Sequence, residues 1–304
     1  MLMNDSQVQT LVEALPYLSK FKNKTIVVKY GGNAMLNDEL KNKVLQDIVF
    51  LQCAGMRPVV VHGGGPEITR MLMQAGKKSE FVSGLRVTDA ESVGIAEMAL
   101  VGKINTDLVA RLNTLGGKAV GLNGKDATLI QAKKHLADVY ENGEVNLVDI
   151  GYVGNVEKVN TELIDVLLNA GFIPVIAPTG VGAQGETYNI NADSVAGEVA
   201  GALKAEKLLV LTDVRGIYSD YRDENSFLST LTFEKAQELI IRGKIDGGMI
   251  PKVRACITAL SGGAKKTHII DGRAEHTILM EILSDKGVGT EVVKELKEFP
   301  RGIN

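Results

Sequence analysis

Cysteine is scarce in this chain: Cys53 and Cys256 are the only two among 304 residues. Both lie in apolar stretches with helical periodicity, and neither has metal-ligand spacing, so we expect buried thiols in a reducing compartment and no disulfide framework. No apolar run approaches the roughly 18 residues that a membrane-spanning helix needs. Residues 1–5 lack the basic stretch and apolar core of a secretory signal. These absences predict a cytoplasmic protein with no membrane partner.

An excess of positive charge is also missing. The chain carries 34 basic and 37 acidic residues, a net charge of −3, which argues against nucleic acid as the main partner. Any anion site must therefore be local. With 45% hydrophobic and 23% charged residues, the composition is that of an ordinary globular enzyme. The length suffices for one large α/β domain or for two lobes around a sizeable core.

Three signatures of nucleotide enzymes are missing as well. The G-x-x-x-x-G-K-[ST] loop of Walker-type NTPases does not occur, and neither do the H-R-D and D-F-G motifs of protein kinases. The G-x-G-x-x-G fingerprint of dinucleotide-binding domains follows neither of the two strands at 26–28 and 58–62. These absences exclude the commonest nucleotide-binding classes.

Two glycine-rich loops each follow an apolar run. Residues 26–28 are β-branched and uninterrupted, which predicts a buried strand of a parallel sheet, and Lys29, Gly31 and Gly32 come directly after them. The apolar run at 58–61 leads into glycines 63–65, before a helical pattern. A fixed cation beside exposed backbone N–H groups is the chemistry of a phosphate site, and a plain turn seldom needs three glycines. For the first loop taken alone, a solvated lysine on a glycine turn is the alternative.

Strand patterns alternate with amphipathic helical patterns along most of the chain. The expected strands are residues 26–28, 58–62, 119–122, 172–177, 207–211 and 267–270, and the expected helices are residues 38–54, 103–115, 161–170, 193–203, 232–242, 251–260 and 276–283. This order predicts an α/β fold with an open, mainly parallel sheet sandwiched by helices, and ligands at the carboxyl ends of its strands. Residues 128–132 and 146–150 instead predict a β-hairpin subdomain, and residues 219–226 a polar loop.

Three later clusters place polar side chains beside turns. Two asparagines and an aspartate within residues 189–193 precede a helix, and either Asn191 or Asp193 is expected to cap it. A Thr-Asp pair at 212–213 ends a strand, where its side chains face the crevice. Lys252 follows a glycine loop into the first turn of a helix, where a cation opposes the helix dipole unless an anion lies nearby. All three fit a phosphoryl-transfer site.

Taken in order, these motifs resemble those of the amino acid kinase family. They are Lys29-Tyr30-Gly31-Gly32, His62-Gly63-Gly64-Gly65, Gly84-Leu85-Arg86-Val87-Thr88, Asn189-Ile190-Asn191-Ala192-Asp193, Thr212-Asp213-Val214-Arg215-Gly216 and Asp246-Gly247-Gly248-Met249-Ile250-Pro251-Lys252. Each motif is weak alone, but six in order are specific. Within the family they are most similar to those of the members that phosphorylate the side-chain carboxylate of N-acetyl-L-glutamate in the second step of arginine biosynthesis, in the form that arginine inhibits.

The resemblance implies a role for named residues, with ATP and Mg²⁺ as nucleotide and cofactor and the metal held mainly by phosphates and water. Lys29 and Lys252 would flank the transferring phosphoryl group, and Asp193 would position both. The expected ligands of acetylglutamate are Gly64, Gly65, Arg86 and Asn189, and the expected nucleotide and phosphate ligands are Gly31, Gly32, Thr212, Asp213, Lys244 and Met249. The alternative for Arg86 is a plain surface charge. A carboxylate acceptor is already ionised at neutral pH, so no general base is required.

By the same resemblance, residues 1–23 form an N-terminal helix and residues 24–304 one kinase domain, divided at about residue 185 into an acyl-substrate lobe and a nucleotide lobe with an effector segment. Apolar residues recur at helical spacing within 8–18, so this stripe must be buried on its own lobe or on a neighbouring subunit, and Pro16 is expected to bend the helix. The resemblance implies burial on a neighbouring subunit, in a homo-oligomer whose N-terminal helices interlace three dimers. The expected arginine-binding residues are Tyr17, His268, Glu281 and Gly287, with ordinary packing as the alternative.

Two other functions fit the sequence. The first is a kinase that acts on a homologous carboxylate such as acetylaminoadipate, which is longer by one methylene. A binding pocket discriminates between such homologues by only about 1–3 kcal/mol of free energy. The second alternative is a non-catalytic arginine sensor on this fold. The presence of Lys29, Lys252 and Asp193 argues against the sensor.

Overall fold

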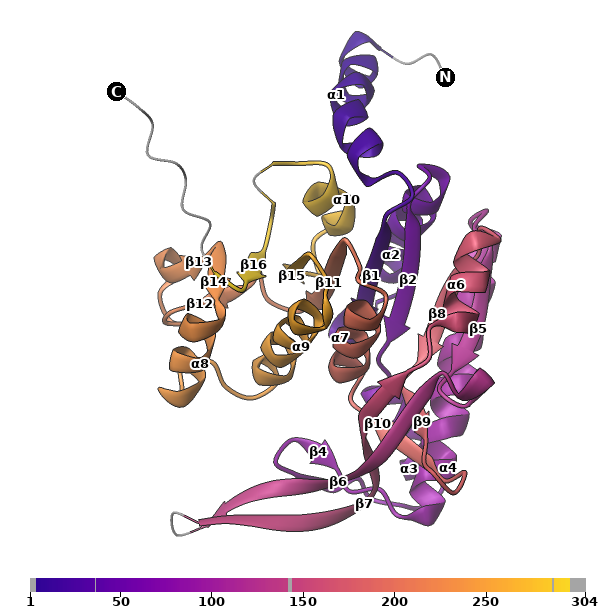
Figure 1. Ribbon diagram of the computed structural model, residues 1–304, viewed down its shortest axis with the longest axis vertical. Coiled ribbons are helices and arrows are strands. Elements are labelled where there is room, and N and C mark those ends of the chain that lie inside the picture. Colours follow the sequence, from indigo (N-terminus) through magenta and orange to yellow (C-terminus); the bar gives the residue numbers. More distant parts are fainter. Residues whose placement is uncertain (1–3, 36, 142–143, 286, 296–304) are drawn as a thin grey trace.

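The computed structural model describes residues 4–35, 37–141, 144–285 and 287–295. One eight-stranded sheet runs through its centre (Figure 1). Its strands are β1 (Thr25–Tyr30), β2 (Arg57–His62), β5 (Ala119–Asn123), β8 (Ile173–Ala177), β11 (Lys207–Thr212), β14 (Thr230–Thr232), β15 (Lys266–Asp271) and β16 (Thr290–Val293). Their order is β14-β16-β15-β11-β1-β2-β8-β5, and every neighbouring pair is parallel except β15 and β16. The expected mainly parallel α/β sheet is confirmed.

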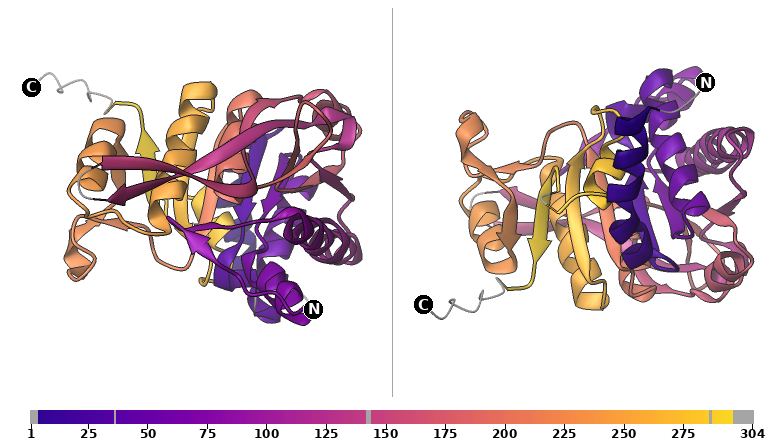
Figure 2. Two further views of the ribbon diagram at one scale, coloured as in Figure 1. Left: turned by 90° about the horizontal axis from the view of Figure 1, so that it is seen from below. Right: turned by 90° about the horizontal axis from the view of Figure 1, so that it is seen from above.

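The central strands are buried on both faces because their side chains are apolar on both. In β1, Val27 packs into the core on one face, while Ile26 and Val28 pack into the core on the other. The first core is closed by α6 (Glu162–Asn169), α7 (Ala192–Ala202), α8 (Phe233–Ile241) and α9 (Met249–Gly262), and the second by α2 (Asp38–Cys53), α5 (Thr106–Thr114) and α10 (Thr277–Ile282). Helices therefore cover both faces of the sheet (Figure 2), and the carboxyl ends of β1, β2 and β11 meet at one edge.

The hairpin subdomain is much longer than the sequence predicts. Its strands, β6 (Ile130–Glu141) and β7 (Glu144–Val159), are antiparallel and extend past the carboxyl edge of the sheet (Figure 1). With β9 (Thr179–Val181) and β10 (Thr187–Ile190) they close a small barrel. Backbone hydrogen bonds of 2.9 and 2.7 Å on either side of Thr88 tie β7 to the segment that follows β3 (Phe81–Val82) and β4 (Leu85–Arg86). The polar residues of the distal strands hid their extent from pattern analysis.

One continuous helical run occupies residues 90–114, although the sequence predicts a helix only over residues 103–115. It comprises α4 (Ala90–Glu97), a π-helical segment η2 (Met98–Asn105) and α5. Gly94 and Gly102 weaken the helical pattern before residue 103. The remaining elements are α3 (Gly65–Gln74), η1 (Gly32–Met35), η3 (Asp126–Thr128), η4 (Glu224–Ser226), β12 (Ile217–Tyr218) and β13 (Phe227–Leu228).

The two cysteines differ in their surroundings. Cys256 is buried in α9 as expected, but Cys53 is exposed, so the prediction of two buried thiols is wrong for Cys53. It is the last residue of α2, where the chain leaves the helix through Ala54 and Gly55. An apolar sequence neighbourhood does not bury a side chain that faces outward at a helix end.

The N-terminal helix α1 (Asp5–Phe21) stands clear of the sheet for most of its length (Figure 1). A capping box at Asn4 starts it, and it continues through Pro16. Only its C-terminal end is anchored, since Phe21 belongs to the buried core. Its apolar stripe is exposed, with fractions of 46, 53, 57 and 59% for Val8, Leu11, Val12 and Leu15. None of the helices within the described ranges is both long and apolar enough to cross a bilayer.

Helices α7 and α9 approach each other closely through glycine. A Cβ placed on Gly262 would lie 2.7 Å from the Cα of Gly201, and one placed on Gly197 would lie 2.6 Å from the carbonyl oxygen of Ala255. These distances are too short for a methyl group, so the two backbones meet because side chains are missing there. The small residues of α7 thus set how far α7 and α9 lie apart.

We expect Gly197→Ala to lower the free energy of unfolding by about 1–3 kcal/mol, because the backbone at Ala255 must move to admit the methyl group. Gly94→Ala is the matched control, since its Cβ would meet no heavy atom within 4 Å. It should stabilise the helix by up to about 1 kcal/mol. Urea unfolding of both variants makes the comparison, and equal stabilities would contradict the close contact.

Candidate active site

Three charged side chains from distant parts of the chain meet at the carboxyl edge of the sheet. Lys29 lies near the end of β1, Asp193 in the first turn of α7, and Lys252 near the start of α9. The Oδ1 atom of Asp193 is 2.9 Å from the Nζ of Lys29, and its Oδ2 atom is 3.2 Å from the Nζ of Lys252. The structure therefore brings together the three residues predicted to be catalytic, with one carboxylate between two cations.

Asn191, and not Asp193, caps α7. Its side-chain oxygen accepts the backbone N–H groups of Asp193 at 2.8 Å and of Ser194 at 3.3 Å. The carboxylate of Asp193 is thus left to face the lysines. Because strand side chains alternate between faces, Lys29 shares with Val27 the face of β1 that α7 covers.

Burial and charge act against each other in this group. Lys29 and Asp193 are 6% and 5% exposed. Burial lowers the pKa of Lys29, an effect that Asp193 offsets only in part. Burial would raise the pKa of Asp193, but Lys29 and Lys252 outweigh it and hold that pKa below its ordinary value. With both lysines protonated, the group carries one net positive charge, which favours an anionic ligand.

The two glycine loops contact each other, as the sequence predicts for one shared site. A Cβ on Gly31 would lie 3.1 Å from the Nζ of Lys29 and 3.4 Å from the Cα of Gly63. The N–H of Gly63 donates to the carbonyl oxygen of Tyr30 at 2.7 Å. The loops after β1 and β2 therefore present backbone beside the ammonium group of Lys29.

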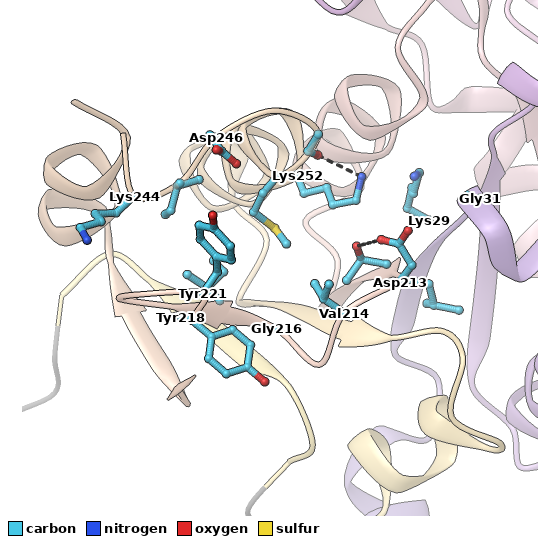
Figure 3. Close-up of a pocket in the computed structure, with 17 residues that line it drawn as sticks. Lys29, Gly31, Asp213, Val214, Gly216, Tyr218, Tyr221, Lys244, Asp246 and Lys252 are labelled. Carbon is cyan, nitrogen blue, oxygen red and sulfur yellow. Dashed lines mark hydrogen bonds between the residues drawn. The ribbon is translucent and has the colours of Figure 1, made fainter. Parts of the chain in front are cut away.

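A cavity of about 640 Å³ opens beside these loops (Figure 3). It is lined by both lysines and by every residue predicted to bind nucleotide and phosphate, namely Gly31, Gly32, Thr212, Asp213, Lys244 and Met249. Thr212 is the last residue of β11, so the cavity lies over the carboxyl edge of the sheet. Its volume is within the range of small-molecule sites.

Sequence reasoning missed part of this lining. Tyr218 and Tyr221 line the cavity (Figure 3) and come from the segment around the predicted polar loop. Tyr221 is 72% exposed. Lys244 is held by Asp220 of the same loop at 3.2 Å. The signal that could have found Tyr221 is an aromatic residue in a polar loop, and an exposed ring at the rim of a cavity is suited to stacking on a base.

Arg86 is not a plain surface charge. It is 8% exposed, and its guanidinium donates to the Oγ of Ser79, to the carbonyl oxygen of Gly65 at 3.0 Å and to the Oγ1 of Thr69 at 2.8 Å. The same group lies 4.7 Å from the centre of the Phe81 ring. An arginine has five N–H donors, so donors remain for a ligand. No motif marks Thr69 or Ser79 in the sequence.

Three of the four predicted acetylglutamate ligands are grouped at the start of α3. Gly64 is its N-cap and Gly65 its first residue, where backbone N–H groups and the helix dipole favour an anion, and Arg86 contacts Gly65. Asn189 lies apart, in β10, where it pairs with Val153 of β7. Within the described ranges, no hydrogen bond joins the side chain of Asn189 to Arg86 or to the glycines.

A second cavity, of about 280 Å³, lies at the amino edge of the sheet. It is lined by all four residues predicted to bind arginine, namely Tyr17, His268, Glu281 and Gly287. Tyr17 comes from α1 and Glu281 from α10. The cavity therefore joins the N-terminal helix to the sheet.

Glu281 already has partners in this cavity. Its Oε1 atom lies 2.9 Å from the Nζ of Lys207 and 3.0 Å from the Nδ1 of His268, and its Oε2 atom accepts the N–H of Val288 at 3.0 Å. Burial would raise the pKa of Glu281, but His268 and Lys207 lower it to about 2. The buried Nε2 of His268 has no hydrogen-bond partner among the described residues. The sequence signal for Lys207 is a lysine that opens an apolar strand.

Comparison with known proteins places this geometry in a family. The model of the amino acid kinase family matches residues 24–271. A protein of Moorella thermoacetica (strain ATCC 39073 / JCM 9320) that is named acetylglutamate kinase is 58% identical over 283 residues, which cover 93% of this chain and 96% of that protein.

Two solved structures are similar in fold to this chain. N-acetylglutamate synthase from Neisseria gonorrhoeae, complexed with coenzyme A and N-acetyl-glutamate, has a TM-score of 0.80 at 29% identity, covering 96% of this chain and 64% of that chain. The same synthase complexed with coenzyme A and L-arginine has a TM-score of 0.77 at 27% identity, covering 96% and 66%. This chain thus spans less than two thirds of the synthase. With the family model matched over most of the chain, the chain belongs to the amino acid kinase family and is a kinase.

Proposed function

We propose that this kinase transfers the γ-phosphoryl group of ATP to the side-chain carboxylate of N-acetyl-L-glutamate, in arginine biosynthesis in the cytoplasm. The products are ADP and N-acetyl-L-glutamyl 5-phosphate. The observation that carries the proposal is the pair of lysines bridged by Asp193, located where the larger cavity meets the glycine loops. The relative at 58% identity, named acetylglutamate kinase, supports the choice of acceptor.

The reaction requires neutralisation of charge and no general base. The acceptor carboxylate is ionised at neutral pH, and it must approach a polyanionic nucleotide. Lys29 and Lys252 would stabilise the charge that develops on the transferring group and on the β–γ bridging oxygen. Asp193 holds both ammonium groups in place beforehand, so little reorganisation is needed. The N–H groups of the glycine loops add hydrogen bonds to the phosphoryl oxygens.

In this proposal Mg²⁺ arrives with ATP. In the part of the chain that the structure describes, no group of three or more His, Cys, Asp or Glu side chains could hold a metal ion. The carboxylate of Asp193 faces two lysines and is poorly placed to bind a cation. Mg²⁺ keeps several waters and binds substrate phosphates readily, so the phosphates of ATP and water would hold it.

Arg86, Gly64 and Gly65 form the proposed acetylglutamate site, with Asn189 contributed by β10 of the small barrel. The remaining donors of Arg86 suit the α-carboxylate as a planar fork. The test is an assay with ATP and Mg²⁺ in which hydroxylamine traps the acyl phosphate formed from acetylglutamate or from acetylaminoadipate. A higher kcat/KM for acetylaminoadipate would contradict the proposed acceptor, and no acyl phosphate from either would favour a non-catalytic arginine sensor.

We also propose that arginine binds the second cavity and inhibits the enzyme. The Nε2 of His268, which has no hydrogen-bond partner in the described part of the chain, the carboxylate of Glu281 and the nearby Asp285 and Glu291 offer groups for both ends of arginine. Glu281 would share its carboxylate between Lys207 and the incoming guanidinium. The synthase structure complexed with L-arginine supports this choice of effector.

The exposed stripe of α1 is the proposed contact between dimers. The four apolar side chains of that stripe are about half exposed, and the same helix of a second copy would offer a matching stripe. We infer a trimer of dimers built through this contact. Because Tyr17 lies on the same helix as the stripe, a ligand in the second cavity would influence the angle between dimers.

Lys29→Ala and Lys252→Ala should each lower kcat by roughly 10²–10⁴-fold, because each removes charge stabilisation used mainly in the transition state. Lys118→Ala, an exposed lysine remote from both cavities, is the control and should leave kcat unchanged. Full activity in either test variant, with folding verified by circular dichroism, would remove that lysine from the mechanism.

Arg86→Ala should raise KM for acetylglutamate by about 10- to 100-fold, because a hydrogen bond to a charged group is worth about 1.5–3 kcal/mol. KM for ATP should change little. Thr69→Val is the matched control, since it removes one partner of Arg86 and leaves the guanidinium in place. A selective rise in KM for ATP would mean that the two pockets are assigned the wrong way round.

Millimolar arginine should weaken substrate affinity about 5- to 150-fold, the range of ordinary allosteric coupling. Glu281→Gln keeps the shape of the side chain and removes its charge, so it should abolish inhibition and leave assembly intact. The double variant Leu11→Asp/Leu15→Asp keeps Tyr17 and should give an active dimer with most inhibition lost.

Light scattering measures assembly, with Ile241→Asp as a control because Ile241 is 85% exposed on α8, away from α1. A wild-type enzyme indifferent to arginine would refute the effector site. A double variant of undiminished size would refute the α1 contact.

A further inference from the structure

His62 is a fully buried imidazole beneath the glycine loop. It is the last residue of β2 and has no exposed surface. Its Nδ1 atom lies 2.9 Å from the carbonyl oxygen of Gly63, and its Nε2 atom lies 3.1 Å from the Nδ2 of Asn105. Burial lowers its pKa to about 4, so the ring is neutral at pH 7 and carries one proton.

The location of that proton follows from Asn105. The Nδ2 of Asn105 lies 2.8 Å from the carbonyl oxygen of Val175, and a carbonyl only accepts, so the amide nitrogen must face it. The same nitrogen lies 3.1 Å from the Nε2 of His62 and 3.4 Å from the carbonyl oxygen of Leu122. An amide nitrogen offers only N–H donors, so a proton on Nε2 would face another donor, and Nε2 must be unprotonated. The proton is therefore on Nδ1, and it is donated to the carbonyl oxygen of Gly63.

This hydrogen bond orients one peptide of the loop. The N–H of Gly63 donates to the carbonyl oxygen of Tyr30 at 2.7 Å, and the carbonyl oxygen of Gly64 accepts a hydrogen bond from the N–H of Ile68 at 3.0 Å. The N–H of Gly64 has no hydrogen-bond partner within the described ranges. In a trans peptide the carbonyl and the following N–H point in opposite directions, so holding the Gly63 carbonyl toward His62 turns the Gly64 N–H away from the buried ring.

The π-helical segment η2 supplies both the amide and a steric clamp. A Cβ on Gly64 would lie 2.5 Å from a methyl group of Leu100 and 2.7 Å from one of Ile104, and Asn105 is the next residue. In a π-helix, hydrogen bonds join residues five apart, so the turn is wide enough for positions 100, 104 and 105 to share one face. The Oγ1 of Thr106 bonds the carbonyl of Val101, five residues earlier, at 3.2 Å.

From this geometry we infer that Asn105 and His62 are positioning residues for phosphoryl transfer. They act by holding the Gly63–Gly64 peptide so that the Gly64 N–H stays aimed at the anion, which is the phosphoryl group being transferred. The inference rests on the proposed function for the identity of that anion. Neither side chain touches the substrate in this account. Their effect passes through one peptide bond.

Two substitutions at position 62 separate positioning from space filling. The amide N–H of asparagine can replace the Nδ1 donor, whereas leucine fills the buried volume and donates nothing. His62→Leu should lower kcat by about 10- to 100-fold, as expected for a misdirected donor, with KM for ATP unchanged. His62→Asn should retain most of kcat despite lower stability. A kcat of His62→Leu that equals or exceeds that of His62→Asn would overturn the inference.

Asn105→Leu should reproduce the loss seen in His62→Leu, because the tautomer is no longer imposed. The double variant should be no worse than either single one, since both break the same relay. Asn113→Ala is the matched control on the same helical run: it removes hydrogen bonds of 2.7 and 3.2 Å to Ala119. It should lose stability and keep kcat. Fully additive losses at 62 and 105, or a drop in kcat for Asn113→Ala in proportion to its stability, would contradict the relay.

Solid-state NMR of protein labelled with ¹⁵N-histidine tests the premise without substrate. The chain has four histidines, and the His62→Asn variant assigns the signal. The expected spectrum has His62 as the Nδ1–H tautomer at pH 7, shifting in Asn105→Leu. An Nε2–H tautomer in the wild type overturns the inference whatever the substrate. A wild-type chain inactive toward acetylglutamate would instead defeat the proposed function, and the tautomer would still decide the geometry.

Discussion

A buried carboxylate between two lysines is the interaction on which the site depends. Taking three charged groups out of water costs free energy that their attraction offsets only in part. Asp193 nevertheless holds its two partners at 2.9 and 3.2 Å, and the three residues come from three separate elements. With both lysines protonated, one positive charge is left over. A bound anion would complete the group, and its binding would then stabilise the same elements that position the lysines.

Backbone contacts, more than the charged side chains, determine how far those elements lie apart. A lysine side chain is flexible and would accept many distances, whereas Gly197 and Gly262 bring α7 and α9 into direct backbone contact. The two glycine loops meet in the same way at Gly31 and Gly63. Rigid packing of this kind transmits small shifts without absorbing them. A methyl group added at such a contact would therefore change the spacing of Asp193 and Lys252 as well as stability.

The sheet could be predicted because it depends on local patterns, and most of the candidate site because its ordered motifs resemble those of a known family. β-branched runs followed by glycine identify the strand ends, and the two lysines and Asp193 stand in ordered motifs. Pattern analysis failed where position depends on distant partners. The exposed thiol of Cys53, the ion pair of Lys207 with Glu281 and the contact of Asn105 with His62 each require knowledge of which segments fold together. No local sequence pattern identifies the π-helical segment, because its distinguishing feature is its packing against a distant glycine loop.

The two cavities lie at opposite ends of one strand, which limits how an effector could act. β11 has Lys207 at its amino end and Thr212 at its carboxyl end, five residue steps or about 17 Å apart. A strand buried along its whole length cannot shift register without moving its side chains to the wrong face. Coupling must therefore move elements around the sheet. Asp47 of α2 contacts His276 at the start of α10 at 2.6 Å, so a movement of α10 at the second cavity is mechanically tied to the helix that follows the first glycine loop.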